Sequence, residues 1–534
     1  MGLILNDSAA YTGYTLFAPL SYEVTYLIDN QGRLIHSWPS SYTPGLSAYL
    51  TETGELLRTA CVHNSRFVQG GTGGRVELID WDGSLTWAYD YSTQLHCQHH
   101  DIHQLPDGNV LMIAWEYKTR QEAIAAGRNP EFLRQNSLWP DHVIEVDPHT
   151  DSIVWEWHAW DHLVQEFDST KQNYGVVRGH PELLNVNFIS VGQGNADWTH
   201  CNAVTYNPNL DQVMISCREF SEIWVIDHST TTEQARGHTG GRYGRGGDLL
   251  YRWGNQAAYG HGGPGRRRLY TQHWAHWVGD SLQGANDILV FNNGFWPGRA
   301  WSTVDQFTPP NDSLGFYPLR PDTTYGPDAM TWSYGDTGEF FARIISSAQR
   351  LPNGNTLICS GPQGILFEVT PDKRTVWKYI NPVCDSGPMI QYESIPPASN
   401  SVFNTIRYSP SYPAFSGRTL TPGDPIERYP VSAPESRPTP GPGFARLEVT
   451  PNPLRPGSVV RFSLTEPALV SLGIWDALGR SVVEPTRIAL PAGRHALPLP
   501  VRNLPAGTYV CTLNAGAASG SARFTVAVRH ASAP

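Results

Sequence analysis

Two strand phrases recur along most of this 534-residue chain, and internal repetition of this kind constrains the fold more than any other feature. The first phrase is a short apolar strand, a turn with Asp and Gly or Asn, and a second strand that carries Trp. It is found as YLIDNQGRLIHSW (26–38), VELIDWDGSLTWAY (76–89), VIEVDPHTDSIVWEW (143–157), IWVID…DLLYRW (223–253) and LFEVTPDKRTVWKY (366–379). The second phrase is found as HQLPDGNVLMIAW (103–115) and QRLPNGNTLICSG (349–361), with looser copies at 204–217 and 278–294.

Each phrase predicts two strands of alternating apolar and polar residues joined by a tight turn. One phrase of each kind makes a four-stranded antiparallel sheet of roughly forty to sixty residues, the size of one propeller blade. Five units are clear and a poorer one spans residues 301–361. We therefore predict an all-β, six-bladed β-propeller, with seven blades as the open alternative. We expect Gly13–Pro19 to close the ring by completing the last unit, and the repeated Trp residues to pack between blades.

The composition changes after Phe415. Thr421–Gly443 holds seven prolines and no apolar periodicity, which predicts a semi-rigid linker. Beyond it, VVRFSL, LVSLGIWDALGRSV, LPAGTYVCTL and ARFTVAVR are spaced as strands of a small Ig-like β-sandwich. The predicted domains are a propeller over 1–415, a Pro-rich linker over 416–445 and a C-terminal β-sandwich over 446–534.

The charge and hydropathy of the chain restrict its partners. A net charge of −11 disfavours nucleic acid, because binding phosphate backbones needs a concentrated basic surface. The sequence contains no apolar run of about 18 residues, so we expect no membrane span. Neither feature excludes a small anion held in one basic pocket.

Histidines gather in three of the predicted inner-strand phrases. The sets are LHCQHHDIHQ with His96, His99, His100 and His103, then DWTHCN with His200 and Asn202, then TQHWAH with His273 and His276. Because alternate residues of a strand share a face, we expect His200 and Asn202 to point the same way. Arg218 follows a turn and is expected on the adjacent strand, within reach of His200.

Such a set of imidazoles, an amide and a guanidinium predicts an anion site inside the propeller. Arginine offers a fork of donors that matches tetrahedral oxyanions, and histidine acts as nucleophile, acid or base near neutral pH. We predict no metal and no cofactor there. Most of the remaining histidines are expected to cap backbone groups or to lie on the surface; these are His36, His142, His158, His162, His228, His238 and His495.

Several of these motifs, taken in order, resemble the bacterial arylsulfate sulfotransferases. They are GYTLFAP with YLIDNQGRLIHSW, HHDIHQLPDGN, DWTHCN, SCREFSEIWVID, QHWAH and AQRLPNGNTLI. The resemblance runs from about Tyr11 to Pro382. It implies a PAPS-independent transfer of a sulfuryl group from a phenolic sulfate ester to a phenolic acceptor, through a sulfated histidine. Small aryl sulfates and phenols would be the substrates.

The resemblance also implies roles for particular residues. His273 would be the nucleophile, with His200, Arg218 and His100 as catalytic partners that hold the sulfuryl oxygens. Asn202, His99 and His276 would take part in substrate binding. Two choices stay open, between His99 and His100 and between His273 and His276.

The C-terminal segment resembles the sorting domains of the type IX secretion system. The matching residues are Pro451–Pro453, Trp475–Arg480 and Leu504–Tyr509. This resemblance implies a secreted or cell-surface bacterial protein that meets the secretion machinery through its C-terminal domain.

Two other functions fit parts of the pattern. The first is a metalloenzyme that uses the clustered histidines with Cys97 or Cys201, since imidazole and thiolate suit zinc, copper or iron. The second is a non-enzymatic secreted propeller that binds glycans or protein partners.

Overall fold

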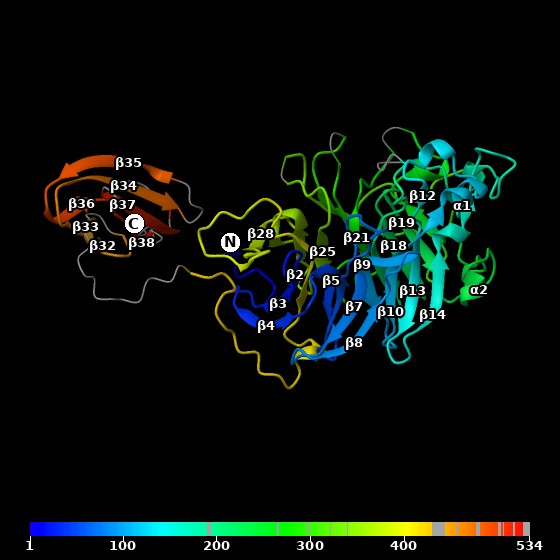
Figure 1. The fold of residues 1–534 in the computed structure, drawn as a ribbon, viewed down its shortest axis with the longest axis horizontal. Coiled ribbons are helices and arrows are strands. Elements are labelled where there is room, and N and C mark those ends of the chain that lie inside the picture. The colour runs from blue at the N-terminus through cyan, green and yellow to red at the C-terminus, as the bar shows by residue number, and fades with distance from the viewer. Residues whose placement is uncertain are drawn as a thin grey trace, which may run out of the picture. The chain divides into compact units, whose positions relative to one another are not determined.

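The computed structural model is described in two compact units, Met1–Arg428 and Tyr429–Pro534 (Figure 1). The described residues are 1–189, 194–263, 266–295, 298–320, 322–338, 340–429, 444–454, 458–476, 481–499, 504–505, 507–515 and 518–526.

The first unit contains six antiparallel sheets, and in each of them four strands lie side by side from the inside of the ring outward. The predicted six-bladed propeller is confirmed. The sheets are β31 (Val402–Tyr408), β2 (Tyr14–Pro19), β3 (Val24–Ile28), β4 (Leu34–Pro39); β5 (Pro44–Leu50), β6 (Leu56–Cys61), β7 (Gly74–Ile79), β8 (Leu85–Asp90); β9 (His96–Gln104), β10 (Val110–Glu116), β13 (Asp141–Asp147), β14 (Ser152–His158); β17 (Cys201–Asn207), β18 (Gln212–Cys217), β19 (Glu222–Asp227), β20 (Tyr251–Trp253); β21 (His273–Trp277), β22 (Ile288–Asn292), β23 (Thr303–Phe307), β24 (Trp332–Tyr334); and β25 (Ser347–Arg350), β26 (Thr356–Ser360), β27 (Ile365–Val369), β28 (Thr375–Ile380). The innermost strands contact one another in the order β31, β5, β9, β17, β21, β25 and back to β31. These contacts close the ring.

The ring closes differently from the prediction. The last repeat unit, β25 to β28, is complete by itself, and it takes β1 (Gly2–Asn6) as a fifth, outer strand (Figure 1). The first repeat unit, β2 to β4, is the one that lacks a strand, because it has no inner strand before β2. That inner strand is β31, which pairs antiparallel with β2. The prediction that Gly13–Pro19 completes the last unit is therefore wrong.

Short elements connect the blades. They are β11 (Lys118–Thr119), α1 (Arg120–Ala125), η1 (Pro130–Phe132), β12 (Ser137–Leu138), η2 (Ala159–Asp161), β15 (Leu163–Val164), η3 (Val177–Gly179), β16 (Leu184–Asn185), α2 (Thr232–Ala235), η4 (Gln256–Tyr259), η5 (Gly361–Gln363), β29 (Val383–Cys384), β30 (Gly387–Pro388) and η6 (Pro413–Phe415). No described helix is long and apolar enough to span a membrane.

Tryptophans of the outer strands join consecutive blades, as predicted. The indole N–H groups of Trp157, Trp253 and Trp377 donate to backbone carbonyls of the next blade, at Gly247, Pro327 and Asn30, over 2.7, 2.9 and 2.9 Å. All three rings are fully buried. A buried indole needs such a partner for its N–H, so each contact sets the spacing of two blades as well as packing them.

The second unit is a β-sandwich. One sheet consists of β32 (Phe444–Thr450), β33 (Val459–Leu464) and β36 (Gly493–Pro498), and the other of β35 (Ser481–Leu490), β34 (Ala468–Asp476), β37 (Gly507–Ala515) and β38 (Ala518–Val526). A single apolar cluster takes residues from both sheets, among them Phe462 and Cys511. Ala477–Arg480 and Ala506, which belong to the motifs of the sorting-domain resemblance, lie outside the described residues.

The propeller unit extends past Phe415 into the range predicted as a linker. Gly423 and Asp424 exchange backbone hydrogen bonds with Leu34, and Arg428 does so with Met389 and Gln391, over 2.7–3.0 Å. Ile426 is buried in this contact. The proline-rich stretch 430–443 lies outside the described residues.

Two truncations separate the functions of these segments. A chain ending at Tyr429 keeps β31 and its docked extension, so we expect a folded propeller with the unfolding temperature of that unit in the full chain. A chain ending at Phe415 loses four backbone hydrogen bonds of the docked segment, each worth about 0.5–1.5 kcal/mol, and is expected to unfold at lower temperature. Thermal unfolding followed by near-ultraviolet circular dichroism checks this. Equal unfolding temperatures would contradict it.

Candidate active site

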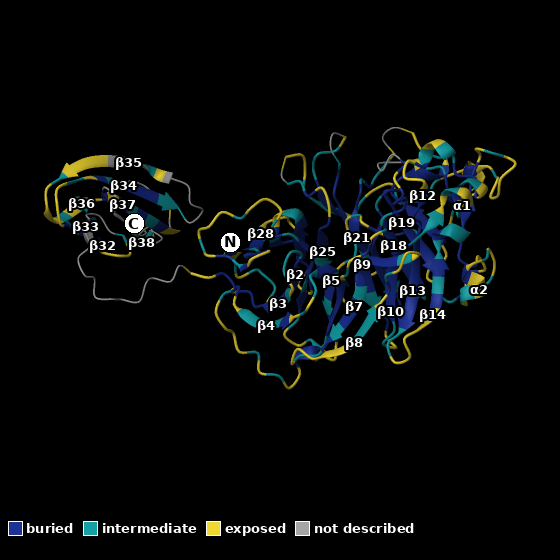
Figure 2. Cartoon of the chain, viewed as in Figure 1, coloured by how far each residue is buried: buried dark blue, intermediate teal, exposed yellow. Residues whose placement is uncertain are grey.

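Three of the predicted histidines converge at the start of the inner strands. His100 lies in β9, His200 directly precedes β17, and His273 begins β21. The ring centroid of His100 lies 4.7 Å from that of His200 and 6.5 Å from that of His273. His100 and His273 are buried, and the strands that carry the cluster are drawn largely dark blue in Figure 2.

Irregular backbone aims these side chains. His100 has φ 53°, His200 φ 49° and Trp274 φ 56°, all in the left-handed region that side chains other than glycine rarely adopt. The register of the inner strand also shifts at each place, as it does at a β-bulge. A bulge redirects a side chain and is common beside active sites. Simple alternation along the strand, which we used to place His200 and Asn202, therefore does not apply here.

His100 is connected to a buried carboxylate through His99. Nε2 of His99 lies 2.5 Å from an oxygen of Asp141, and its Nδ1 lies 2.7 Å from Nδ1 of His100. With the Nε2 proton of His99 directed at Asp141, the proton between the two rings belongs to His100. Nε2 of neutral His100 is then an acceptor. Burial, followed by the charges of His200 and other neighbours, lowers the pKa of His100 well below its ordinary value.

The contacts of His99 are all with the protein. Its side chain is completely buried, stacks on Trp115 at 3.8 Å and has both ring nitrogens engaged. In the described structure His99 therefore positions His100, and a contact of His99 with substrate stays a prediction.

His200 has its own carboxylate. Its Nδ1 lies 2.5 Å from one oxygen of Asp197, whose other oxygen accepts the indole N–H of Trp115 over 2.9 Å. Burial favours the neutral imidazole, but the charge and hydrogen bond of Asp197 outweigh it and raise the pKa of His200. Asp197 therefore favours the protonated form of His200.

His273 is held as a neutral ring with a defined tautomer. Its Nδ1 lies 2.8 Å from the side-chain oxygen of Asn293, whose amide nitrogen donates to the carbonyls of Ala342 and Ile345. That orientation obliges His273 to donate from Nδ1, which leaves the lone pair on Nε2, where it accepts the backbone N–H of Ile345 over 3.3 Å. Burial, followed by the charge of Arg218, lowers the pKa of His273 to about 3. Nε2 is accordingly unprotonated at neutral pH.

Arg218 follows β18 directly, as predicted, and its backbone N–H donates to the carbonyl of His200 over 3.1 Å. Its guanidinium pairs with Glu219 and keeps 21% of its surface exposed. It also acts electrostatically on His100, His200 and His273. Arg218 is thus a cation at the solvent-facing side of the cluster.

The two remaining predicted residues differ in their surroundings. Asn202 is buried and donates to the carbonyl of Gln272, the residue before His273, over 2.8 Å, and among the described residues its side-chain oxygen has no partner. His276 lies three residues farther along β21, where its electrostatic neighbours are Arg350 and His103.

The sequence analysis missed several residues that shape the site. Asp141 and Asn293 set tautomers, and Phe403 of β31 lies against the rings of His100 and His273 with centroids 6.0 and 6.5 Å away. Phe403 belongs to no repeated phrase. Asp141 and Asn293 stand at the ends of recognisable strands, the one local signal that was present.

The metal cluster of the alternative metalloenzyme hypothesis does not form among these histidines in the described structure. Within the described part of the chain, the ring nitrogens and thiols of the site do not come together as three mutually close ligand atoms.

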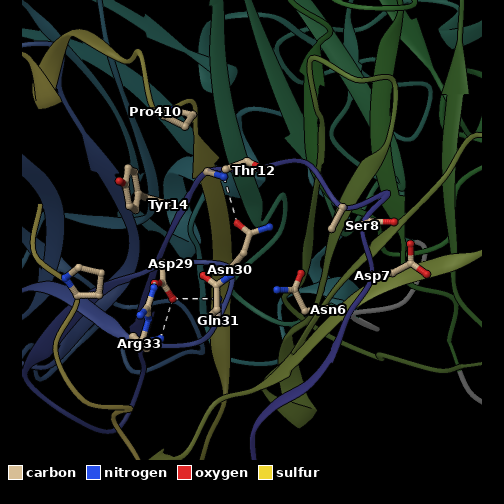
Figure 3. A pocket seen from close by; sticks show the side chains of 13 residues that line it. Asn6, Asp7, Ser8, Thr12, Tyr14, Asp29, Asn30, Gln31, Arg33 and Pro410 are labelled. Atoms are coloured by element: carbon tan, nitrogen blue, oxygen red, sulfur yellow. Dashed lines mark hydrogen bonds and ion pairs between the residues drawn. The ribbon is translucent and has the colours of Figure 1, made fainter. Parts of the chain in front are cut away.

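A separate pocket of about 390 Å³ lies near the N-terminus (Figure 3). It is lined mainly by the connection from the end of β1 to the start of β2 and by the β3–β4 turn, and Pro410 and Pro422 complete the lining. Asp29 accepts from the guanidinium of Arg33 and from the backbone N–H of Gln31. The charges of Asp29 and Arg33 in this pocket are therefore paired with each other. It contains no histidine, and the histidine cluster remains the candidate site.

Comparison with known proteins identifies a family match. The model of the arylsulfotransferase (ASST) family matches residues 20–393. No match was found among curated protein sequences. Similar solved structures include a protein of unknown function from Bacteroides caccae (12% identity, 69% of this chain and 93% of that chain, TM-score 0.37) and virginiamycin B lyase from Staphylococcus aureus (10% identity, 70% and 86%, TM-score 0.33). TM-scores this low carry no argument about activity.

The family match spans more than half of the chain and includes His100, His200, Arg218 and His273. On this match, the chain belongs to the arylsulfotransferase family.

Proposed function

We propose that this enzyme moves a sulfuryl group from a phenolic sulfate ester to a phenolic acceptor, without a nucleotide sulfate donor and through a sulfohistidine at His273. The observation that carries the proposal is that the surroundings shift the pKa values of two histidines of one cluster in opposite directions. His273 is a neutral imidazole with a lone pair on Nε2, and its electrostatic neighbours are Arg218 and His200, whose pKa is raised by Asp197. Groups whose surroundings push their pKa values apart take up complementary roles in catalysis.

In the first half-reaction, Nε2 of His273 attacks sulfur and the bond from sulfur to the aryl oxygen breaks. The leaving phenolate takes a proton from His200, whose pKa is raised by its contact with Asp197. In the second half-reaction the acceptor phenol returns its proton to His200, its oxygen attacks sulfur, and His273 is released. The covalent intermediate divides the exchange into two similar steps.

Charge on the three sulfuryl oxygens is met by fixed donors. Arg218 offers a fork of N–H groups, and donors aimed where charge develops are the largest resource in such transfers. Neutral His100 presents an acceptor, so it donates to a sulfuryl oxygen only after gaining a proton. An entering anion favours that proton, and Asp141 behind His99 balances its charge.

The nucleophile is tested by trapping the intermediate. Enzyme mixed with an aryl sulfate and no acceptor is expected to gain the mass of one sulfuryl group on His273, measured by peptide mass spectrometry under alkaline conditions. His273→Ala should remove both the adduct and turnover, because the proposed nucleophilic nitrogen is then absent.

Two variants serve as controls for this test. His276→Ala changes the same strand outside the cluster and should retain the adduct. Arg218→Ala should retain the nucleophile but lose about 10²–10³ in rate, the penalty for deleting one oxyanion donor, and Arg218→Lys should restore little because a point charge lacks the fork. Full activity of His273→Ala would refute the assignment.

The pH dependence tests His200. Because its pKa is raised, the cation is present below that pKa and is lost as the pH rises through it, so kcat/KM for the aryl sulfate should fall on the alkaline side. His273, with a pKa of about 3, should cause no acid-side loss near neutral pH. Asp197→Asn removes the charge that raises the pKa of His200 and should move the alkaline limb to lower pH. An unmoved limb in that variant would contradict the role of His200.

We also propose that the C-terminal β-sandwich directs export to the cell surface or the medium. The support is its motif resemblance to sorting domains and its separation as a compact unit. In the producing bacterium, the chain ending at Tyr429 should stay inside the cell envelope while the full chain leaves it, as fractionation would show. Equal export of both would refute this.

A further inference from the structure

A second histidine cluster lies on the connections outside the third and fourth blades. His162 follows η2, after β14 of the third blade, whereas His238 and Asp248 belong to the glycine-rich connection between β19 and β20 of the fourth. Nδ1 of His162 lies 2.8 Å from Oδ1 of Asp248, and Nδ1 of His238 lies 2.7 Å from the same oxygen. All three ligand atoms lie within 4.8 Å of one another.

A backbone carbonyl determines which ring nitrogen of His162 carries a proton. Its Nε2 lies 2.8 Å from the carbonyl oxygen of Ala235, an atom that only accepts, so Nε2 carries a proton. In neutral His162 the lone pair is then on Nδ1, facing the carboxylate of Asp248. Two acceptors in contact repel each other unless a proton or a metal ion lies between them. His162 and Asp248 are both buried, which makes the contact more demanding.

The surroundings of His162 are those of a metal ligand. A ligating histidine typically donates its other N–H to a backbone carbonyl or a carboxylate, which fixes the tautomer and the ring orientation. Here the backbone carbonyl of Ala235 accepts that N–H from His162, and the His162 ring stacks on Trp157 with an interplanar angle of 4°. A side chain at Gly247 would meet the carbonyl of Ala235 at 2.0 Å and Nε2 of His162 at 2.6 Å, so the connection approaches this ring as only glycine allows.

We propose that His162, His238 and Asp248 bind one divalent metal ion of the zinc class. Two imidazoles and a carboxylate are ligands that Zn²⁺ accepts, with a fourth position left for water. Ligand atoms about 2.0–2.1 Å from a tetrahedral metal lie about 3.3 Å apart, so the present contacts need to open by about half an ångström. His238 is exposed and can move to allow this.

A metal ion in this site would cross-link the outer connections of two blades. Its three ligands come from the connections that follow β14 and β19, so a bound ion adds a bond between the third and fourth blades. This role is structural and does not depend on the proposed sulfuryl transfer, because none of the three residues contacts His100, His200 or His273 in the described structure.

The test measures metal binding by the full chain. Protein stripped with a chelator is titrated with Zn²⁺ in competition with a chromophoric chelator, and Co²⁺ is used as a spectroscopic probe of coordination. We expect one Zn²⁺ per chain, a tetrahedral Co²⁺ absorption spectrum, and a higher unfolding temperature with Zn²⁺, since an ion that binds only the folded state stabilises it.

A matched pair of variants locates the ion. His238→Ala removes an exposed ligand without opening the core and should weaken Zn²⁺ binding by at least about 10–100-fold, the loss seen even for outer-shell changes. His180→Ala removes another exposed histidine that pairs with a carboxylate, Glu182 at 2.9 Å, and should leave binding unchanged. Absence of Zn²⁺ binding, or equal binding by wild type and His238→Ala, would overturn the proposal and leave the cluster a protonated His–Asp–His contact.

Discussion

The pairing of β2 with β31 is the contact on which the geometry of the propeller depends. It joins strands almost the whole propeller apart in sequence, as in the hydrogen bond from Thr405 to the carbonyl of Leu16 across 389 positions. A completely buried ion pair between Arg407 of β31 and Glu368 of β27 ties the same strand to the neighbouring blade. Removing one partner of such a pair typically costs 3–5 kcal/mol, so this contact strongly opposes a shifted register of β31.

One side chain connects the closure of the ring with the candidate site. Phe403 stands on β31 and packs against His100, His273 and Trp274, so the last strand to join the ring also forms a wall of the site. The histidines come from three other blades, and their distances depend on six blades meeting around one axis. A site assembled in this way requires the complete ring, which explains why no single repeat unit contains it.

Repetition in the sequence was sufficient to predict the blades, whereas the site needed information that repetition does not contain. The apolar periodicity of the sequence predicts the strands and the positions of their Trp residues. Because Trp157 and Trp253 are buried between blades, they form the expected inter-blade contacts. The closing strand VFNTIRY matches no phrase, so its position was missed. The left-handed residues His100, His200 and Trp274 are neither glycine nor asparagine, so no local signal announced the bulges that direct them. The sequence was therefore sufficient to propose the candidate residues as a group, while the contacts of His99 and Asn202 required coordinates.

Two buried carboxylates give two histidines of one cluster different characters. Asp197 contacts His200 directly with one oxygen and accepts from Trp115 with the other. Asp141 reaches His100 only through His99, and it also accepts from Thr199 and from the backbone N–H of Cys201. The intervening ring of His99 separates the charge of Asp141 from His100. Direct contact with a carboxylate therefore raises the pKa of His200, whereas the pKa of His100 lies well below its ordinary value. Trp115 holds both arrangements in register, because it stacks on His99 and donates to Asp197 at the same time.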